Sequence, residues 1–519
     1  MDSLIFQTTV HGSIEAHCHQ NPAQLCCSLR VNGQWEDYTR QVFWDYVCRY
    51  AAAFNTYLPT PTLILFVKKL DIHLLAAYIG AMKAGHIPAQ ISFPSTKVNE
   101  VEYRTKIHHI HAITKFGAIF TEEEEQDRFS AFGDGLVVSP GILLQATDSA
   151  VPFRATKDAL AQFSSGTTGL QKGVILSHHG IVSHMQNYAA WLKLSPNDAI
   201  VTWLPLYHDM GLIACYLMPL MCGIPFYQMD PFDWIMQPDI LLQSIEERRP
   251  TICFLPNFTY QVLANKGRVR DLSSIRLWIN CSEPARVKSH QAFLDKFPSV
   301  KPENLTVCYA LAENTFAVSQ TLPWHSNTTR VHPGMNILSC GRLIHGVEVR
   351  IFKDDEADVE GEIGIRSPFL LDRFIDGSLP LRDGFCLTGD LGFLDDTGEM
   401  FITGRKKDII IVHGKNVYPQ DVEYVASEVA GVYPGRSVAF GIWDDDIGTE
   451  ELFVIVERQS EAAPTPIKIA VQKAVNEEIG IVPKRVEVVE HMSLVKTSSG
   501  KISRSRNREV YLHKGFNLL

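Results

Sequence analysis

The sequence lacks the features that would place it in a membrane or on a nucleic acid. No apolar run in its 519 residues approaches the length of about 18 that a membrane-spanning helix needs, so we expect no stable membrane anchoring. The N-terminus has no charged segment followed by an apolar one, which predicts a cytoplasmic protein. The 58 acidic residues outnumber the 48 lysines and arginines, and the formal net charge is −10. This excess of negative charge argues against binding to nucleic acid or anionic lipid.

Cysteine spacing typical of a zinc site is absent as well. The 11 cysteines are odd in number and scattered, and Cys26 and Cys27 form the only adjacent pair. We therefore interpret them as reduced, mostly buried thiols. The composition that remains is that of a globular enzyme, with 45% hydrophobic and 20% charged residues. Because the length exceeds what one hydrophobic core can hold, we expect two or more domains.

The first part of the chain alternates between short apolar runs and helical patterns. Residues 62–67 form a continuous apolar run, which is typical of a buried parallel strand. Residues 71–84 follow as an amphipathic helix, and residues 41–57 carry a similar helical pattern. Further strands are expected at residues 118–121 and 136–138. Strand followed by helix is the repeating unit of an α/β fold, which is the fold class we predict.

Residues 162–173 read Gln-Phe-Ser-Ser-Gly-Thr-Thr-Gly-Leu-Gln-Lys-Gly and suggest an anion-binding loop. Glycines let backbone amides approach an anion closely, and hydroxyl side chains add donors for phosphate oxygens. Lys172 supplies a compact positive charge suited to a polyphosphate. The order differs from that of the common P-loop, which ends in Gly-Lys-Ser/Thr at a helix start. Taken alone, such a cluster is also typical of an ordinary surface loop.

Three later stretches place polar side chains where a pocket is expected. Residues 202–211 carry His208 and Asp209 on one short turn before an apolar segment. This arrangement fits a pocket wall, and it also fits a capped helix, because a carboxylate near a helix N-terminus is favourable by itself. Glu283 and Glu313 each follow an apolar strand, and ligands collect at such positions in parallel sheets.

The C-terminal third adds three more short motifs. Asp390 stands in a Thr-Gly-Asp turn, residues 404–419 contain Gly-Arg-Lys-Lys-Asp followed by Gly-Lys-Asn-Val-Tyr-Pro, and residues 496–502 contain Ser-Ser-Gly-Lys. In this order, from about residue 60 to the C-terminus, the motifs resemble the adenylate-forming superfamily of acyl-CoA synthetases, luciferases and peptide-synthetase adenylation domains. Within that superfamily the chain is most similar to the fatty acyl-AMP ligases. The similarity to these ligases is carried by residues 204–213, 339–342, 416–423 and 496–501.

The resemblance implies a fold and a reaction. The fold would be a large N-terminal domain of α/β sheets, residues 1–404, with a small mobile α+β C-terminal domain, residues 405–519. In the reaction, a carboxylate attacks the α-phosphorus of ATP to give an acyl-adenylate and pyrophosphate, and a thiol then displaces AMP. The implied acceptor is the phosphopantetheine thiol of an acyl carrier protein. CoA is the alternative acceptor, because only about 27 residues separate Glu313 from Gly341, too few for the insertion thought to disfavour CoA in fatty acyl-AMP ligases.

The resemblance also implies roles for individual residues. Those that would bind the nucleotide are Ser164, Ser165, Gly166, Thr167, Thr168, Gly169 and Lys172 at the phosphates, Ser282, Glu283, Pro284, Tyr309, Ala310, Leu311 and Ala312 at the adenine, and Asp390 and Arg405 at the ribose. Glu313 and Thr168 would hold Mg²⁺, a hard cation that favours such oxygen ligands. Lys501 would bridge the reacting carboxylate and the α-phosphate, and the implied catalytic set is Lys501, Glu313 and His208. Lys407 falls at the hinge of the mobile domain, and residues 408–422 would line the pantetheine tunnel.

The acid pocket and the acceptor surface are less specified. The expected pocket residues are His208, Met229, Asp230 and Cys281. Asp230 could pair with the ammonium of an amino-acid substrate, or it could cap a turn before a proline. A basic patch predicted to dock an acidic carrier protein consists of Lys484, Arg485, Arg504 and Arg506, and a solvated face is its alternative. An inactive nucleotide-binding or carrier-docking module is a second hypothesis, but an enzyme is favoured because Lys501 and Glu313 are both present.

Overall fold

The computed structural model describes most of the chain between residues 4 and 516. The described residues are 4–94, 100–130, 135–145, 156–163, 173–322, 337–355, 357–413, 415–445, 447–459, 462–497, 501–513 and 516. Within these ranges, no helix is both long enough and apolar enough to cross a bilayer.

The largest sheet in the described part of the chain has nine strands. In spatial order they are β15 (Arg342–Leu343), β14 (Ala317–Gln320), β13 (Leu305–Ala310), β12 (Leu277–Cys281), β11 (Ile252–Leu255), β9 (Ile200–Thr202), β10 (Phe226–Met229), β1 (Leu25–Val31) and β2 (Gln34–Thr39). Every neighbouring pair from β13 to β1 is parallel, while the strands at both margins are antiparallel. The carboxyl ends of the central strands therefore share one edge of the sheet.

A second sheet contains the strands expected near the N-terminus. In spatial order it holds β18 (Arg373–Phe374), β8 (Gly173–Ser177), β7 (Asp158–Phe163), β4 (Ile87–Gln90), β3 (Leu63–Val67), β5 (Ala118–Thr121) and β6 (Leu136–Val138). The strands predicted at residues 62–67, 118–121 and 136–138 are confirmed as β3, β5 and β6. Both β3 and β5 are buried at every position and pair in parallel, as expected for continuous apolar runs.

The helices pack against these two sheets, and the two helices predicted near the N-terminus are confirmed as α2 and α3. The second begins at Ile72 because Asp71 Oδ1 accepts a hydrogen bond from the Leu74 amide at 2.8 Å. The helices of the large lobe are α1 (Val10–Gln20), α2 (Arg40–Tyr57), α3 (Ile72–Lys83), α4 (Glu100–Thr114), α5 (Gln126–Phe129), α6 (Pro140–Leu143), α7 (His178–Trp191), α8 (Met218–Cys222), α9 (Pro231–Met236), α10 (Asp239–Arg248), α11 (Asn257–Lys266) and α12 (Val287–Lys296), with a π-helix, η2 (Met210–Leu217), and 3₁₀ turns η1 (Glu123–Glu125), η3 (Pro302–Asn304) and η4 (Ala312–Asn314).

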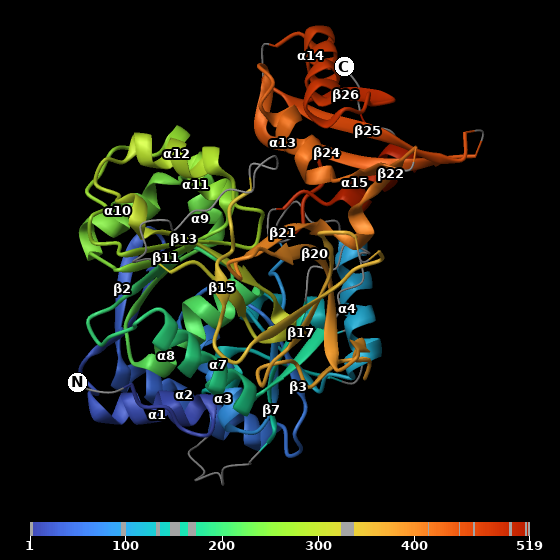
Figure 1. The fold of residues 1–519 in the computed structure, drawn as a ribbon. Coiled ribbons are helices and arrows are strands. Elements are labelled where there is room, and N and C mark those ends of the chain that lie inside the picture. Colours follow the sequence, from blue (N-terminus) through green and yellow to red (C-terminus); the bar gives the residue numbers. More distant parts are fainter. Residues whose placement is uncertain are drawn as a thin grey trace.

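A third sheet connects the large lobe to the C-terminal elements. It contains β16 (Glu348–Phe352), β17 (Gly361–Arg366), β20 (Phe385–Leu394), β19 (Leu381–Arg382) and β21 (Met400–Arg405). The chain then passes through the 3₁₀ turn η5 (Lys406–Asp408) into a smaller lobe (Figure 1). That lobe contains β22 (Ile410–Val412), β23 (Lys415–Val417), α13 (Pro419–Ser427), β24 (Val432–Asp444), β25 (Thr449–Arg458), α14 (Pro464–Ile479), β26 (Arg485–Val489) and α15 (Arg504–His513).

The small lobe has apolar cores of its own. One core contains buried side chains such as Val422 and Val471, and another contains Phe440 and Leu494. The α/β class with a large lobe of sheets and a small α+β lobe is therefore confirmed. The division of domains at residues 404 and 405 stays a prediction, although it coincides with the end of β21.

All eleven cysteines are free thiols, which agrees with the interpretation drawn from their spacing. Ten of them are buried, and Cys48 is half-buried. Burial raises the pKa of Cys215 and of Cys340 to about 12, so both side chains are protonated at neutral pH.

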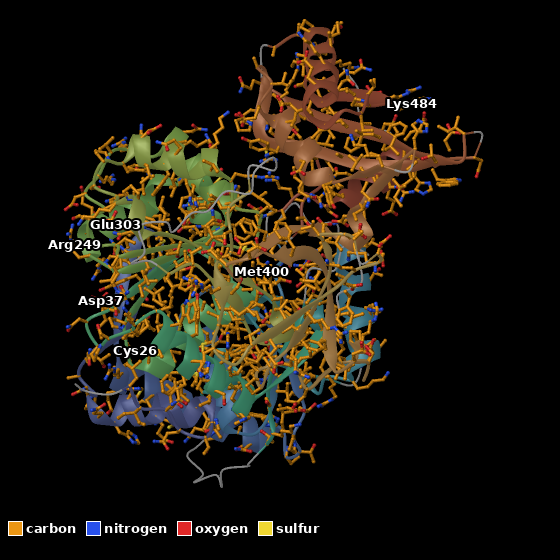
Figure 2. All side chains as sticks on the ribbon, in the orientation of Figure 1. Cys26, Asp37, Arg249, Glu303, Met400 and Lys484 are labelled. Carbon is orange, nitrogen blue, oxygen red and sulfur yellow. The ribbon has the colours of Figure 1, made fainter. Side chains whose placement is uncertain are left out.

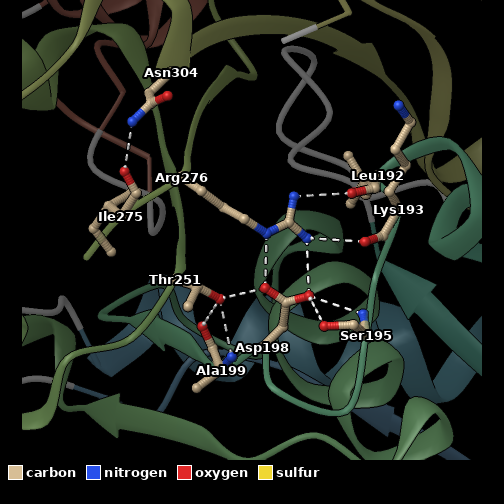
Figure 3. Close-up of polar contacts among 9 residues, drawn as sticks. All are labelled: Leu192, Lys193, Ser195, Asp198, Ala199, Thr251, Ile275, Arg276 and Asn304. Atoms are coloured by element: carbon tan, nitrogen blue, oxygen red, sulfur yellow. Dashed lines mark hydrogen bonds and ion pairs between the residues drawn. The ribbon is translucent and has the colours of Figure 1, made fainter. Parts of the chain in front are cut away.

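A polar cluster ties the amino ends of three neighbouring strands together (Figure 3). Ala199, Thr251 and Arg276 directly precede β9, β11 and β12, and Asp198 lies at the centre of the cluster. The Asp198 carboxylate accepts hydrogen bonds from Thr251 Oγ1 at 2.7 Å and from Arg276 Nε and Nη2 at 2.7 and 2.9 Å. Burial raises the pKa of Asp198, but these bonds outweigh it and hold the pKa below its ordinary value. The amino edge of the sheet is thus fixed by a buried charge.

Candidate active site

The opposite, carboxyl edge of the same sheet gathers the polar residues that the sequence singled out. His208 follows β9, Glu283 follows β12 and Glu313 follows β13. Because these strands are parallel and lie within three positions of one another in the sheet, their following loops meet above one edge. The large lobe therefore supplies the framework of a site at this edge, facing the small lobe (Figure 1).

The turn after β12 meets the small lobe directly. Ser282 has a φ of 76°, in the left-handed region that residues other than glycine rarely adopt. Its carbonyl oxygen accepts a hydrogen bond from Lys501 Nζ at 2.7 Å. The Glu283 carboxylate accepts a hydrogen bond from the Phe258 amide at 3.1 Å. A strained backbone of this kind persists only where its surroundings hold it, and such positions cluster at functional sites.

A buried network holds this turn in place. Asn280 Nδ2 donates to Asn257 Oδ1 at 3.0 Å and contacts His290 Nε2 at 2.9 Å. Asn257 Oδ1 also accepts a hydrogen bond from the Arg286 amide at 3.1 Å. Burial lowers the pKa of His290 to about 4, so the imidazole is neutral and its Nε2 accepts the bond from Asn280. The network fixes the residues on both sides of the Ser282 turn.

Asp390 lies at the centre of a second cluster. Its carboxylate accepts a hydrogen bond from Tyr309 Oη at 2.8 Å and pairs with Arg405 Nε at 2.9 Å. Asp390 and Arg405 are direct partners on β20 and β21, so strand register fixes this ion pair. The Asp390 charge raises the pKa of Arg405, and burial together with Asp390 raises that of Tyr309. The residues assigned separately to adenine and ribose are therefore in contact.

Glu313 lies on η4 beside this cluster. Burial raises its pKa, and the nearby carboxylates of Asp390 and Asp209 raise it further, while Arg405 acts in the opposite direction. Among the described residues, Glu313 forms no ion pair, and no group of three His, Cys, Asp or Glu side chains could hold a metal ion. A recessed carboxylate among other acids fits Mg²⁺, which binds one or two carboxylates and completes its shell with phosphate oxygens and water.

His208 and Asp209 form an adjacent hydrogen-bonded pair. His208 Nδ1 lies 2.7 Å from Asp209 Oδ1, and the same oxygen accepts a hydrogen bond from the Met210 amide at 2.8 Å. Asp209 thereby caps the π-helix η2, so the capped-helix interpretation is confirmed, and it also orients the His208 ring. Burial raises the pKa of Asp209, but His208, the Met210 amide and the Lys501 charge together lower it. Lys501 therefore acts electrostatically on this pair.

The expected acid-pocket residues do not all lie together. Met229 and Cys281 are buried and end β10 and β12, but β9 and β11 separate their strands. Asp230 Oδ1 accepts a hydrogen bond from the Phe232 amide at 2.7 Å and caps α9, whose first residue is Pro231. The observed role of Asp230 is thus the turn-capping one, and burial raises its pKa, which disfavours a fixed negative charge.

Sequence reasoning missed an aromatic cluster between these strands. Trp203, after β9, stacks on Trp234 of α9 with ring centroids 3.9 Å apart and planes 8° apart. Phe258, on α11, packs against both rings at 6.2 Å. Neither indole N–H has a hydrogen-bond partner among the described residues. Trp203 adjoins a motif that the sequence did mark, but no local signal pairs it with Trp234.

The hinge and the acceptor surface are placed as follows. Lys407 lies in η5, directly after the pair formed by Arg405. Lys484, Arg485 and Arg504 of the expected basic patch each form ion pairs, and the docking role of the patch stays a prediction. Figure 2 shows Lys484 at the outer side of the small lobe, where it pairs with Glu451 at 2.8 Å. The other pairs are Arg485 with Glu487 at 3.9 Å and Arg504 with both Asp408 and Glu423 at 2.7 Å.

The glycine-rich loop lies outside the described residues. Ser164, Ser165, Gly166, Thr167, Thr168, Gly169 and Lys172 all belong to this stretch. Its flanks are described, because Phe163 and Gly173 are paired at the ends of antiparallel strands β7 and β8. The loop therefore connects two neighbouring antiparallel strands of the second sheet.

Comparison with known proteins adds evidence independent of this geometry. The sequence model of the family described as AMP-binding enzyme matches residues 14–373. JamA of Moorena producens, a medium-chain-fatty-acid acyl-carrier-protein ligase, is 31% identical over 406 residues covering 68% of each chain. FadD26 of Mycobacterium tuberculosis, a long-chain-fatty-acid AMP ligase, is 26% identical over 515 residues, with 86% of this chain and 87% of FadD26 covered. A solved structure from work on fatty acyl-adenylate ligases of E. coli and L. pneumophila has the same fold, with a TM-score of 0.86, 22% identity and 97% of both chains covered.

Proposed function

The chain belongs to the AMP-binding enzyme family and is an adenylate-forming ligase that uses ATP to activate an acid; from this membership we propose that the acid is a fatty acid and that its acyl group passes to the phosphopantetheine thiol of an acyl carrier protein. The observation that carries the proposal is the approach of Lys501 Nζ to the Ser282 carbonyl, beside Asp209, Glu313 and Asp390. In this proposal, Lys501 is the cation that the small lobe supplies to the reacting centre.

The nucleotide would lie between the two clusters described above. In this proposal, Asp390 accepts hydrogen bonds from the ribose hydroxyls, and Arg405 fixes the orientation of the Asp390 carboxylate. Tyr309, residues 282–284 and residues 310–312 enclose the adenine, and residues 164–172 hold the phosphates. When bound, Mg²⁺ held by Glu313 and Thr168 would neutralise phosphate charge. The buried Asn280 network supports the adenine contacts because it fixes the Ser282 turn.

Lys501 would act at the first step. An oxygen of the substrate carboxylate forms a bond to the α-phosphorus while the bond from this phosphorus to the bridging oxygen breaks, and pyrophosphate leaves. Two anions must approach each other in this step, and the Lys501 ammonium between them lowers the electrostatic cost. In the second step the acceptor thiolate attacks the acyl carbonyl and AMP leaves with its electron pair. His208, oriented by Asp209, would form the wall of the acid pocket beside the reacting carboxylate.

CoA is a second candidate acceptor, and two observations favour it. Only about 27 residues lie between Glu313 and Gly341, which leaves little room for an insertion that restrains the small lobe. The pairing of Lys484, Arg485 and Arg504 with carboxylates also removes free positive charge that would attract an acidic carrier. The relative JamA, which is named for its carrier-protein acceptor, supports the carrier instead.

The test is substrate-dependent pyrophosphate exchange over a panel of fatty, aryl and amino acids, followed by competition between CoA and a holo carrier protein. The proposal expects exchange with fatty acids and acyl transfer to the carrier. The variant Lys501→Ala is the matched control and should show exchange lowered about 10²–10³-fold. Exchange with amino acids only would overturn the fatty-acid assignment. Transfer to CoA without any acyl-carrier product would make the chain an acyl-CoA synthetase.

A further inference from the structure

One short segment of the large lobe makes several contacts with the small lobe. This segment, residues 282–288, contains the Ser282 turn and the start of α12. The Ser282 carbonyl accepts the bond from Lys501 Nζ, and Arg286 Nη2 pairs with Asp421 Oδ1 at 2.8 Å. Lys288 forms an ion pair with Glu428. The site and the lobe contact therefore share one stretch of chain.

The contacts on the small lobe lie along one side of α13. Asp421, Tyr424 and Glu428 are spaced three and four residues apart, which places them on one helical face. The Arg286 guanidinium pairs with Asp421 and also lies 4.9 Å from the centroid of the Tyr424 ring. Arginine suits this double role because its planar group can stack and donate hydrogen bonds together.

Burial distinguishes Arg286 from the neighbouring ion pair. Its residue exposure is 6%, whereas the Lys288 and Glu428 side chains are 59% and 38% exposed. Exposed ion pairs contribute little to holding two surfaces together, while a desolvated arginine bonded on one side and stacked on the other contributes more. The backbone of Arg286 is also held in place by the large lobe. Its amide donates a hydrogen bond to Asn257 Oδ1, the same atom that accepts a hydrogen bond from Asn280 Nδ2.

A continuous chain of contacts connects Arg286 to Lys501. Asp421 and Glu423 both lie on α13, and Glu423 accepts hydrogen bonds from Arg504 Nε at 2.8 Å and Nη2 at 2.7 Å. Arg504 begins α15, three residues after Lys501. The position of α13 against Arg286 therefore sets the position of the segment that carries Lys501.

We propose that Arg286 is a positioning residue for adenylation, which docks α13 of the small lobe onto the large lobe and thereby brings Lys501 to the Ser282 turn. The proposal rests on the adenylating role of Lys501 proposed above. In this proposal the Arg286 side chain acts on the reaction through Lys501, so it is a positioning residue and not itself a catalytic one. Its removal frees the small lobe to leave the docked placement, which affects the half-reaction that needs Lys501 and spares the one that does not.

The first experiment measures the two half-reactions separately in the full-length enzyme. Arg286→Ala should lower pyrophosphate exchange about tenfold, while acyl transfer from a supplied acyl-adenylate stays within about twofold of wild type. Asp421→Asn should act in the same direction without altering the adenine turn. Arg350→Ala, which removes an exposed ion pair with Asp383 in the same lobe, is the matched control and should change neither rate. Equal losses in both half-reactions would overturn the proposal.

A double variant separates positioning from local damage. If Arg286 acts through Lys501, then Arg286→Ala should cause no further loss of exchange in a Lys501→Ala background. A merely structural role would still add its full loss there, through a poorer adenine turn and a higher KM for ATP. Joint reversal, Arg286→Asp with Asp421→Arg, should recover part of the activity that either single reversal loses. Additive losses would refute the coupling.

A distance measurement tests the docking without any activity. Spin labels on cysteines introduced at the exposed positions Gln291 on α12 and Lys473 on α14, in a Cys48→Ser background, report the separation of the lobes. Arg286→Ala should broaden the distance distribution and shift it to longer values. If the distribution changes but no acid is activated, then the proposed function fails while the docking role stands. If an active enzyme keeps an unchanged distribution, then the docking role is wrong.

Discussion

Replacing Asp390 by alanine should raise the KM for ATP about 10- to 150-fold while leaving the KM for the acid within about twofold. The Asp390 side chain is 9% exposed, and Tyr309 and Arg405 hold its carboxylate in one orientation, so its ribose contact would be preorganised. A hydrogen bond to a charged group contributes about 1.5–3 kcal/mol, and every 1.4 kcal/mol is a factor of ten in affinity. The substitution also removes the repulsion between Asp390 and the ATP phosphates, which by itself would lower the KM for ATP. This effect should be small, because Arg405 already neutralises most of the Asp390 charge.

The assay is initial-rate pyrophosphate exchange at varied ATP and saturating acid, below the unfolding midpoint of each variant. Asp390→Asn keeps an acceptor oxygen and should show a smaller increase in KM. Tyr309→Phe removes only the hydroxyl that orients the carboxylate, so its increase should be smaller than that of Asp390→Ala. Asp383→Ala, an exposed aspartate near the same sheet, is the control and should leave KM unchanged. The Thr-Gly-Asp segment, expected as a turn, lies within strand β20, and an unaltered KM for ATP in Asp390→Ala would show that its carboxylate is only structural.

Three further predictions follow from the same geometry. Lys501→Ala should lower adenylation about 10²–10³-fold and leave transfer from a supplied acyl-adenylate largely intact; equal losses in rapid-quench assays of both steps would reject this division. Asp198→Ala should lower the free energy of unfolding by roughly 1–3 kcal/mol, because it removes the buried acceptor of hydrogen bonds from Thr251 and Arg276. The Asp198 charge stabilises the folded state fully above the unfolded pKa of about 3.9, and this stabilisation is lost as the pH falls through the lower folded pKa. Calorimetry should therefore show the unfolding free energies of wild type and Asp198→Asn converging below about pH 4. Trp234→Ala should shift the preferred acid to longer chains by at least about tenfold in kcat/KM ratio, if the stack on Trp203 ends the acid pocket; an unchanged profile over a chain-length series would place the pocket elsewhere.

The sequence predicted the parts of the fold that depend on local pattern. The apolar runs that became β3 and β5 and the helical periodicity that became α2 and α3 all lie within a few residues of their expected bounds. Motif resemblance also selected Tyr309, Asp390 and Arg405, which the structure brings into one cluster. Their contact depends on strand register, which no local stretch specifies.

The sequence did not predict contacts between residues that lie far apart along the chain. Arg286 meets Asp421 across 135 residues, and Arg276 meets Asp198 across 78 residues. The pairing of Arg504, in the expected basic patch, with Glu423 was missed for the same reason, since these residues lie 81 positions apart in the sequence. Counting charges along the chain detects cations, but it cannot detect the carboxylates that folding brings to them.

The burial of the cysteines has a consequence for the accuracy of acyl transfer. An acyl-adenylate is a mixed anhydride, and it acylates any thiolate within reach, including those of the enzyme that made it. Ten of the eleven thiols here are buried, among them Cys281 beside the Ser282 turn. Because the thiolate is the reactive form, pKa values of about 12 for Cys215 and Cys340 keep those side chains unreactive at neutral pH. The packing that stabilises the sheet thus also keeps most of the enzyme's own thiols away from an activated acyl group.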